Sequence, residues 1–383
     1  MTPVSAGVGF PERPLPEPDI ARADGWVARA MGEGLLDPGV AQRVRIVTRL
    51  SRRQTVSGQA LARDLGISRA AIHKHVDLLR ASGVGIASST GSGYVLEPPC
   101  DQLLPETVLA LLLGWAPPPA STSTLIGLPY LYEARTPSTN LVLKARASDL
   151  PGGAVAVTDF QEAGRGRLGR TWVCEPGKDL TFSVLLRPGI ASAEAPRLVL
   201  AASVAVAEAL AEIGGLEGRV GIKWPNDVQI DGRKVCGILS EASMDMDALH
   251  WVVIGVGVNV NGSPVRAAAT SAAMTGDIGR ATSLAESLGG PVPRGFLLIR
   301  LLGELGKRWS AVEQGRWSDV RMAYGRLDSL AGSSVVVRSG LERDVVVAEG
   351  TAEGLGPDGE LRVRSSDGAL RLVTAGEVTL GGI

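Results

Sequence analysis

Residues 228–260 read VQIDGRKVCGILSEASMDMDALHWVVIGVGVNV, and this stretch indicates the fold class. Three apolar segments, 228–230, 237–241 and 251–260, have the composition of β-strands. They follow one another without a helical pattern between them. Consecutive strands of this kind are typical of an α+β sheet rather than of a doubly wound α/β sheet. The sequence therefore predicts a mixed sheet at the centre of the chain.

The same texture extends outward over residues 128–325. Further strands are predicted at 155–157 and 180–186, and helices at 198–213 and 297–312. After this region, residues 326–383 hold short strand segments separated by Gly and Asp turns, which suits a small barrel. Those segments are 334–338, 343–351, 361–364 and 370–373.

Residues 41–98 carry the pattern of a winged helix-turn-helix. Apolar residues recur at helical spacing, and Ser57 and Ser68 stand where helix N-caps belong. Gly66 separates two of the helices by a tight turn. A hairpin over 84–96 follows, with glycines at its turn.

Two flanking segments are expected to hold less structure. Residues 1–40 are rich in Pro, Gly and Ala, and we predict a poorly ordered leader with one short helix at about 20–31. Residues 99–127 are predicted to be a linker, because they end in a stretch rich in Pro, Ser and Thr at 116–124.

Composition excludes several classes of protein. The chain has 383 residues, a net charge of −1 and three cysteines. Cys100, Cys174 and Cys236 lie far apart, which argues against a disulfide scaffold or a zinc knuckle. No apolar run reaches the roughly 18 residues of a membrane span, and the first residues lack the pattern of a secretory signal. We expect a cytoplasmic protein with no membrane partner.

The segment from Arg43 to Glu97 is basic on an otherwise acidic chain. The segment contains nine Lys and Arg residues and three acidic residues, so its net charge is about +6 and that of the rest of the chain is about −7. Such a charge is typical of phosphate binding, and the second helix of the helix-turn-helix suits a DNA major groove. The alternative is a solvated charged helix in a protein–protein module, while His73 and His75 lack a third metal ligand nearby. The predicted DNA-binding residues are Ser68, Arg69, Ala70, His73 and Lys74.

Polar clusters in the middle region are unlike core sequence. The first, TPSTN at 136–140, places small hydrogen-bonding side chains after a strand and is by itself only a helix cap. The second, QEAGRGRLGRTW at 161–172, alternates arginines with glycines and predicts a flexible cationic loop whose backbone amides can face an anion. Its alternative is a solvated basic loop. Trp172 is either a flat face for a nucleobase or a core aromatic.

Two more clusters follow. KWPND at 223–227 precedes GRKVCGIL at 232–239, where Lys234 leads into a strand and is expected to point into a pocket. Asp227 follows a proline turn and suits orienting an amine or holding a metal. GVGVNVN at 255–261 is a buried strand whose glycines let a ligand approach the backbone.

In this order and at these spacings, the clusters resemble the biotin–protein ligase family. With the front domain, the resemblance extends to ligases that also repress a biotin operon. It spans residue 44 to the end and is strongest over 137–261. It implies a class II synthetase-like catalytic domain and an SH3-like C-terminal domain. The residues that carry it are Ser138 to Asn140, Gly164 to Arg170, Lys223 to Asp227, Arg233, Lys234, Gly237 to Leu239, Gly255 to Asn259, and Gly66 to His75.

The resemblance implies a two-step reaction. The carboxylate of biotin attacks the α-phosphate of ATP, which gives biotinyl-5′-AMP and pyrophosphate. A lysine amine of a biotin carboxyl carrier domain, of the acetyl-CoA carboxylase type, then attacks the acyl carbon. Mg²⁺ would accompany ATP, and cationic side chains would neutralise the two anionic reactants. A homodimer and biotin-responsive repression at operator DNA are also implied.

The resemblance assigns roles to individual residues. Lys234, Arg165 and Arg167 would be catalytic, with the arginines on a loop that closes over the acyl-phosphate and excludes water. The implied biotin-binding residues are Ser138, Thr139, Asn140, Gln161, Gly164, Arg165, Gly166, Arg167, Lys234 and Gly237. The implied nucleotide-binding residues are Arg165, Arg167, Arg170, Trp172, Lys223, Asn226, Asp227 and Asn259. No protein-held metal is expected.

Two other functions remain open at this point. A ligase for a related acyl acid such as lipoate would share the catalytic fold, and the arginine–glycine loop with WPND argues against it. A ligand-sensing transcription factor with a decayed enzyme domain is disfavoured by intact Arg165, Arg167 and Lys234. Cys236 is expected to be a small buried side chain rather than a nucleophile.

Overall fold

A seven-stranded mixed sheet forms the centre of the molecule, in the order β3-β4-β5-β9-β8-β7-β6. β3 and β4 are parallel, and the other neighbours run antiparallel. The prediction of an α+β fold with a mixed central sheet is therefore confirmed. The strands are β3 (Tyr130–Glu133), β4 (Val155–Thr158), β5 (Leu180–Leu186), β6 (Val220–Lys223), β7 (Asp227–Ile230), β8 (Arg233–Met244) and β9 (Leu249–Val258).

The computed structural model describes residues 18–51, 54–89, 93–97, 101–115, 126–245, 248–269, 280–339 and 345–381. Four parts named in the sequence analysis lie outside these ranges: the first part of the predicted leader, the turn of the predicted wing, Cys100 and the Pro-rich end of the predicted linker. Among the helices within these ranges, none is both long and apolar enough to cross a bilayer.

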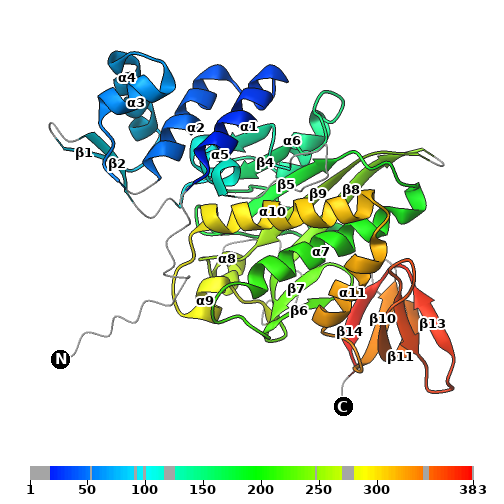
Figure 1. Cartoon of the computed structure of the whole chain (residues 1–383). Helices are drawn as coiled ribbons and strands as arrows, with labels where there is room; N and C mark the ends of the chain where they lie inside the picture. The colour runs from blue at the N-terminus through cyan, green and yellow to red at the C-terminus, as the bar shows by residue number, and fades with distance from the viewer. Residues whose placement is uncertain are drawn as a thin grey trace, which may run out of the picture.

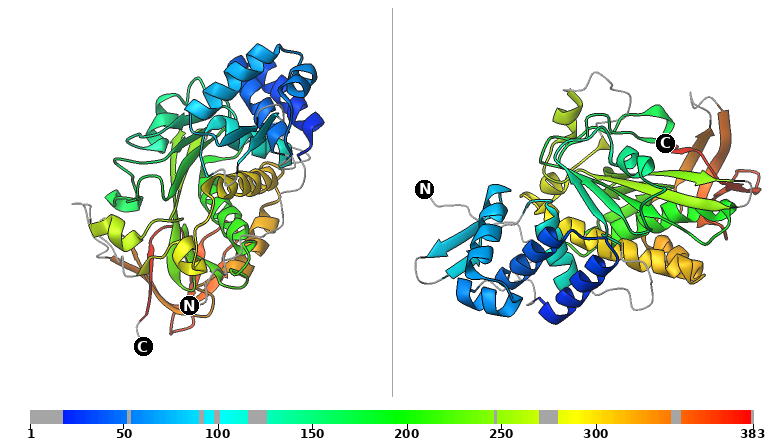
Figure 2. Two further views of the ribbon diagram at one scale, coloured as in Figure 1. Left: turned by 90° about the vertical axis from the view of Figure 1, so that its left-hand side faces the viewer. Right: turned by 90° about the horizontal axis from the view of Figure 1, so that it is seen from above.

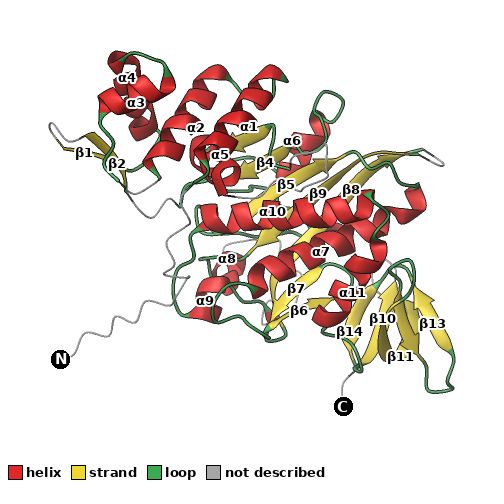
Figure 3. Ribbon diagram, viewed as in Figure 1, coloured by secondary structure: helices red, strands yellow, loops and turns green. Residues whose placement is uncertain are grey.

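Helices cover the sheet on both faces. On one face, α7 (Ala195–Ala211) and α10 (Arg294–Glu313) lie side by side across the strands (Figures 1 and 3). They correspond to the helices predicted at 198–213 and 297–312, and each begins three residues earlier than predicted. On the other face, Leu143 of α6 (Thr139–Ala145) packs with Leu185 and Val253. The remaining helices of this region are α8 (Pro264–Ala269), α9 (Leu284–Leu288) and α11 (Trp317–Leu327).

The N-terminal region contains the expected helix-turn-helix and hairpin. The side chain of Ser57 accepts the backbone N–H of Ala60 at 3.1 Å, and Ser68 accepts that of Ala71 at 3.1 Å, so both serines are N-caps. Gly66 ends the first of the two helices with a φ of 67°, which glycine adopts without strain. The elements are α2 (Pro38–Leu50), α3 (Gly58–Leu65), α4 (Arg69–Ala81), β1 (Ile86–Ser89) and β2 (Gly93–Leu96).

The predicted leader and the predicted linker each hold one helix, and the first is the short helix predicted at about 20–31. α1 (Ile20–Gly32) packs on α2 through buried Ala23 and Val27. α5 (Pro105–Trp115) contacts both α2 and α10 and joins the helix-turn-helix to the sheet region (Figure 2). The helix predicted at about 20–31 is therefore confirmed, but it is packed against the neighbouring helices rather than loosely ordered, and α5 was not predicted within the linker. Small and apolar residues in both segments supply the packing surface.

The C-terminal region is a five-stranded antiparallel sheet in the order β13-β12-β11-β10-β14. It lies at the opposite end of the molecule from the helix-turn-helix (Figure 1). The fifth strand, β14, was not predicted from the sequence. The strands are β10 (Ser334–Ser339), β11 (Val345–Leu355), β12 (Leu361–Arg364), β13 (Leu370–Val373) and β14 (Glu377–Leu380).

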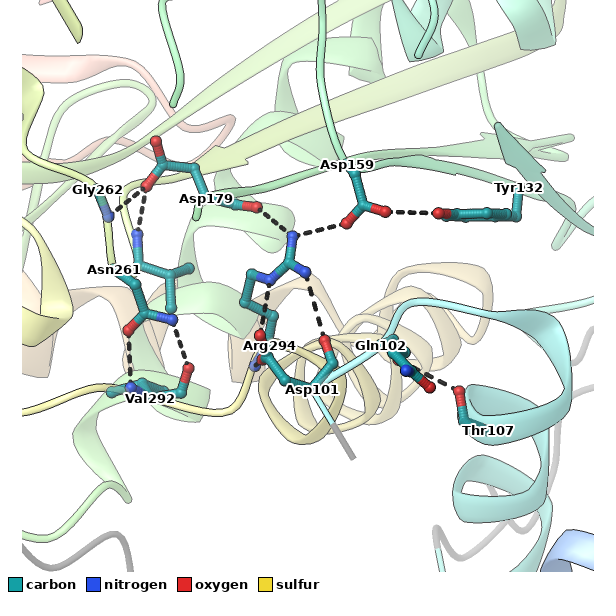
Figure 4. Close-up of polar contacts among 11 residues, drawn as sticks. Asp101, Gln102, Thr107, Tyr132, Asp159, Asp179, Asn261, Gly262, Val292 and Arg294 are labelled. Carbon is teal, nitrogen blue, oxygen red and sulfur yellow. Dashed lines mark hydrogen bonds and ion pairs between the residues drawn. The ribbon is translucent and has the colours of Figure 1, made fainter. Parts of the chain in front are cut away.

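A network of charged side chains around the buried Arg294 connects the segment before α5 to the central sheet (Figure 4). Arg294, the first residue of α10, is 5 % exposed and donates through Nη1 to Asp159 Oδ1 at 2.8 Å. Its backbone N–H donates to Asp101 Oδ1 at 2.5 Å, and its Nε lies 3.4 Å from Asp101 Oδ2. The hydroxyl of Tyr132 donates to Asp159 at 2.5 Å. Because Asp101 precedes α5, Arg294 ties that helix to strands β3 and β4.

Candidate active site

A pocket lies where the start of α6, the 161–172 loop, strands β8 and β9 and the start of β14 meet. Its floor is made by glycines. An ideal Cβ on Gly257 would lie 2.4 Å from Trp172 Cε2, and one on Gly237 would lie 3.0 Å from Trp172 Cζ3. The indole therefore lies flat on the strands only because these positions have no side chain.

The cationic loop is folded back on itself. The backbone N–H of Gly166 donates to the carbonyl of Arg170 at 2.7 Å, and that of Trp172 donates to the carbonyl of Gly164 at 2.9 Å. Leu168 has a φ of 56° and Gly169 a φ of 74° at its tip. A left-handed leucine is strained, so the tip is held by its neighbours.

Two arginines of the loop contact the C-terminal region. Arg167 donates to Asn226 Oδ1 at 2.9 Å and to the carbonyl of Gly376 at 3.2 Å. Arg170 forms an ion pair with Glu377 at the start of β14. The unpredicted strand β14 thus supplies one wall of the pocket, and an acidic side chain that neutralises part of the loop.

Two lysines add positive charge to the same pocket. Lys234 Nζ lies 2.6 Å from Asp227 Oδ1 and 5.8 Å from the centroid of the Trp172 ring. Burial lowers the pKa of Lys223, and Asp227 and Glu377 act against this shift. The pocket therefore holds more cations than carboxylates around one aromatic face, which suits an anion that carries a planar ring.

The remaining wall is uncharged, and several of its polar groups are hydrogen-bonded to one another. The backbone N–H of Thr139 donates to Gln161 Oε1 at 2.9 Å, and Thr139 Oγ1 lies 2.7 Å from Ser183 Oγ. Three residues of this wall are each no more than 5 % exposed to solvent: Ser138, Thr139 and Asn140. Polar groups that are buried in this way recognise a small neutral polar ligand group through defined directions.

Comparisons with known proteins agree with this geometry. The model of the Biotin/lipoate A/B protein ligase family matches residues 132–259, an HTH domain matches 43–95, and the Biotin protein ligase C terminal domain matches 331–381. The bifunctional ligase/repressor BirA of Escherichia coli K12 is 30 % identical over 337 residues, which cover 88 % of this chain and 96 % of that protein. The chain belongs to the biotin protein ligase family.

Two other members of this family show how much of the chain the similarity covers. BirA of Bacillus subtilis strain 168 is 34 % identical over 210 residues, or 55 % of this chain, and the match spans only 61 % of that protein's length. The structure of biotin protein ligase from Aquifex aeolicus in complex with biotin and ATP has a TM-score of 0.54 and 27 % identity. That likeness covers 66 % of this chain and 98 % of the other.

Most of the site residues predicted from the sequence line the pocket. Two do not: Gly164 packs against the carbonyl of Trp172, and Asn259 donates its buried amide to the carbonyl of Thr282 at 3.0 Å. Cys236 is fully buried and burial raises the pKa of its thiol, as a filler side chain requires. The predicted residues at the pocket are Ser138, Thr139, Asn140, Gln161, Arg165, Gly166, Arg167, Arg170, Trp172, Lys223, Asn226, Asp227, Lys234 and Gly237.

The sequence analysis missed three polar residues around the pocket. Glu377 comes from β14, Ser183 from the middle of β5 and Glu241 from β8. None of the three belongs to a cluster of polar residues like those at 136–140 or 223–227, so they did not stand out in the sequence. Only the period of two along β8, which puts Glu241 on the same face as Gly237 and Leu239, gave a usable signal.

The predicted DNA-binding residues share one exposed surface. Ser68 caps α4, and Arg69, Ala70, His73 and Lys74 are exposed along it. The net charge of this domain is lower in effect than the sequence count indicates. Three of its arginines form ion pairs with acidic residues outside the segment that was counted. These are Arg43 with Glu106, Arg45 with Asp24 and Arg49 with Asp24.

Proposed function

We propose that the chain activates biotin with ATP and transfers it to a lysine of a carrier domain of the acetyl-CoA carboxylase type. The observation that carries this is one pocket with two unlike halves. A neutral wall around Thr139 and Gln161 meets a cationic rim around Arg167 and Lys234. Biotin has the matching halves, a neutral cyclic urea and a carboxylate, and ATP adds further negative charge.

In the first step, a carboxylate oxygen of biotin attacks the α-phosphorus of ATP. A bond from oxygen to phosphorus forms as the bond to pyrophosphate breaks, so pyrophosphate leaves. The substrate supplies the nucleophile, and the protein neutralises charge and fixes geometry. Lys234 and Arg167 do this at the α-phosphate, while Arg165 on the loop joins them as it closes over the acyl-phosphate.

The other pocket residues hold the reactants in place. Ser138, Thr139 and Gln161 bind the urea ring, and the Trp172 indole lies against adenine. Mg²⁺ enters as part of the ATP substrate, held mainly by phosphate oxygens. Among the described residues, no three His, Cys, Asp or Glu side chains gather as a protein-held metal would need.

In the second step, a neutral lysine amine of the carrier attacks the acyl carbon of biotinyl-5′-AMP. An amide forms as AMP leaves and the amine loses a proton. The loop must open enough to admit the lysine while water stays out of the mixed anhydride. The ion pair between Arg170 and Glu377 sets how far the loop opens in this proposal.

Mass spectrometry of a biotin carboxyl carrier domain tests this function directly. Incubation with the chain, biotin, ATP and magnesium is expected to add one biotinyl group, with pyrophosphate released in the same reaction. A parallel incubation with lipoic acid tests the alternative substrate. Labelling by lipoate alone would replace the proposal with that of a lipoate ligase, and labelling by neither acid would contradict both.

Changing Gly257 to alanine is expected to raise the KM for ATP about tenfold. The new methyl group would lie 2.4 Å from Trp172, so the indole must leave the strands that hold it. Such overpacking costs roughly 1–3 kcal/mol, and a tenfold change is about 1.4 kcal/mol. Pyrophosphate release at varied ATP measures the effect. Gly303→Ala is the control, because no atom lies within 4 Å of the added carbon. An unchanged KM in Gly257→Ala would show that Trp172 does not contact the nucleotide.

A second function, DNA binding, is favoured by the exposed face of α4. Arg69 is the first residue of the helix that Ser68 caps, and Lys74 is exposed farther along it, so both cations and the helix N-terminus are open to a phosphate backbone. We infer that the chain also binds operator DNA as a biotin-responsive repressor. A homodimer that biotinyl-5′-AMP stabilises stays a prediction, which sedimentation with and without the ligand would test.

Lys74→Ala is expected to weaken DNA binding and to reduce the slope of log K against log salt by about one. The reason is that each lysine at a phosphate releases about one counterion on binding. Electrophoretic shift or anisotropy at several salt concentrations measures the slope. Lys307→Ala on α10 serves as the control, since Lys307 is also an exposed lysine but lies far from α4 in the sequence. An unaltered slope in Lys74→Ala would exclude a phosphate contact at that residue.

A further inference from the structure

Glu241 on β8 lies behind the neutral wall of the pocket. Its Oε2 accepts from Asn140 Nδ2 at 2.8 Å, and its Oε1 accepts from Lys144 Nζ at 2.5 Å. Burial disfavours its charge, but the hydrogen bonds from Lys144 and Asn140 outweigh burial, so the pKa of Glu241 lies below its ordinary value. At neutral pH this carboxylate is ionised and only accepts hydrogen bonds.

That acceptor fixes the direction of each hydrogen bond in a short series of side chains. Because Glu241 only accepts, Asn140 must turn Nδ2 toward it and Oδ1 toward Ser183, whose Oγ lies 2.6 Å away. Oδ1 has no proton, so the hydroxyl of Ser183 donates to it. A hydroxyl has one proton, and therefore Ser183 Oγ must accept from Thr139 Oγ1 at 2.7 Å.

The backbone at Gly255 makes this arrangement possible. Gly255 on β9 pairs with Ser183 on β5, and a Cβ there would lie 2.3 Å from Asn140 Oδ1. Any side chain at that position would push the amide away from Ser183. The glycine thus keeps Asn140 between the carboxylate and the hydroxyl, both of which are needed to set its orientation.

The series ends on two atoms that face the pocket. The proton of Thr139 lies toward Ser183, the nearer of two oxygens, since Gln161 Oε1 is 3.1 Å away. The Thr139 hydroxyl therefore presents a lone pair to a ligand. The backbone N–H of Thr139 donates to Gln161 Oε1, so Gln161 presents Nε2 as a donor. The wall offers an acceptor and a donor side by side.

We propose that Glu241 is a positioning residue that makes the pocket select a ligand ring with an N–H donor. This inference rests on the proposed function and deepens it, because a cyclic urea supplies both the N–H and the carbonyl that the wall requires. The dithiolane ring of lipoate has no N–H and would leave the Thr139 oxygen buried and unpaired. Unpaired buried polar groups are the strongest basis for rejecting a close analogue.

The test compares biotin with its two carbamate analogues, in which one or the other ureido N–H is replaced by a ring oxygen. Calorimetric titration of the full chain without ATP gives each affinity. The unsubstituted chain is expected to prefer biotin over at least one carbamate. Glu241→Ala is expected to lose about tenfold in biotin affinity and to lose most of that preference, since Thr139 is then no longer held as an acceptor.

Three further variants separate positioning from general damage. Glu241→Gln keeps an oxygen that accepts from Asn140 and is expected to bind biotin within about threefold of the unsubstituted chain. Lys144→Met removes the other partner of Glu241 without changing the direction of the series, and is expected to alter biotin affinity less than about twofold. Ser183→Ala interrupts the series at another point and should reproduce Glu241→Ala, which keeps the test decisive if Glu241→Ala does not fold.

Each outcome has one meaning. Full preference for biotin over the carbamates in both Glu241→Ala and Ser183→Ala would overturn the inference and leave the proposed function standing. Equal losses in Glu241→Ala and Lys144→Met would also overturn it, because the effect would then follow charge rather than direction. Absence of biotin binding by the unsubstituted chain would instead contradict the proposed function.

Discussion

Replacing Lys234 by glutamine is expected to reduce biotinyl-5′-AMP formation by about 100- to 1000-fold. Lys234 Nζ lies between Asp227 and the face of Trp172, on the cationic side of the pocket. A group that meets charge as it develops at the reacting phosphate contributes about 2.7–4 kcal/mol when it is already in place. Glutamine keeps a similar length and a donor toward Asp227, but it has no charge.

The measurement is the rate of pyrophosphate release with biotin and ATP at saturation. Lys178→Gln makes the same substitution at an exposed lysine and is expected to leave the rate unchanged. Circular dichroism should show the same unfolding temperature within about 2 °C for both variants. If Lys234→Gln releases pyrophosphate at the rate of the unsubstituted chain, Lys234 has no part in the first step.

Arg294→Met is expected to lower the free energy of unfolding by about 3 kcal/mol. The guanidinium is buried and is bonded to Asp159 and Asp101, so its loss leaves two carboxylates facing a methyl group. Removing one partner of a buried ion pair costs about 3–5 kcal/mol, and the partial exposure of both aspartates places this case at the lower end. Urea unfolding, followed by circular dichroism, measures the change.

Arg300→Met on the same helix is the matched control. Arg300 pairs with Glu212, whose side chain is 60 % exposed, and such a surface pair contributes less than about 1 kcal/mol. A change in Arg294→Met no larger than that in Arg300→Met would mean that water replaces the guanidinium at no cost. The junction in Figure 4 would then contribute little to stability.

Much of the fold could be predicted because its main elements have strong local patterns. The strands expected at 237–241 and 251–260 are the cores of β8 and β9, which pair in the sheet. The caps at Ser57 and Ser68 marked two helices. By contrast, α5 is apolar on nearly every side, so it has no periodicity that separates a packed helix from a linker.

The site was predictable in part for a different reason. Its clusters fall on strand ends and loops, where charged and glycine residues are conspicuous in an apolar sequence. The closeness of β14 to the loop follows from how the two sheets meet, and the bond from Asn259 to Thr282 joins residues 23 positions apart, so neither can be found from local sequence. Tertiary neighbours of this kind require coordinates.

The position of α5 has a practical consequence for anyone who wishes to separate the two halves of the molecule. Its leucines, including Leu109 and Leu113, are buried with α2 and α10 together as its neighbours. Cleaving the chain on either side of this helix would expose apolar side chains to water in one fragment or in both. Transplanting the helix-turn-helix region onto another protein would therefore require a host that offers a replacement for α10.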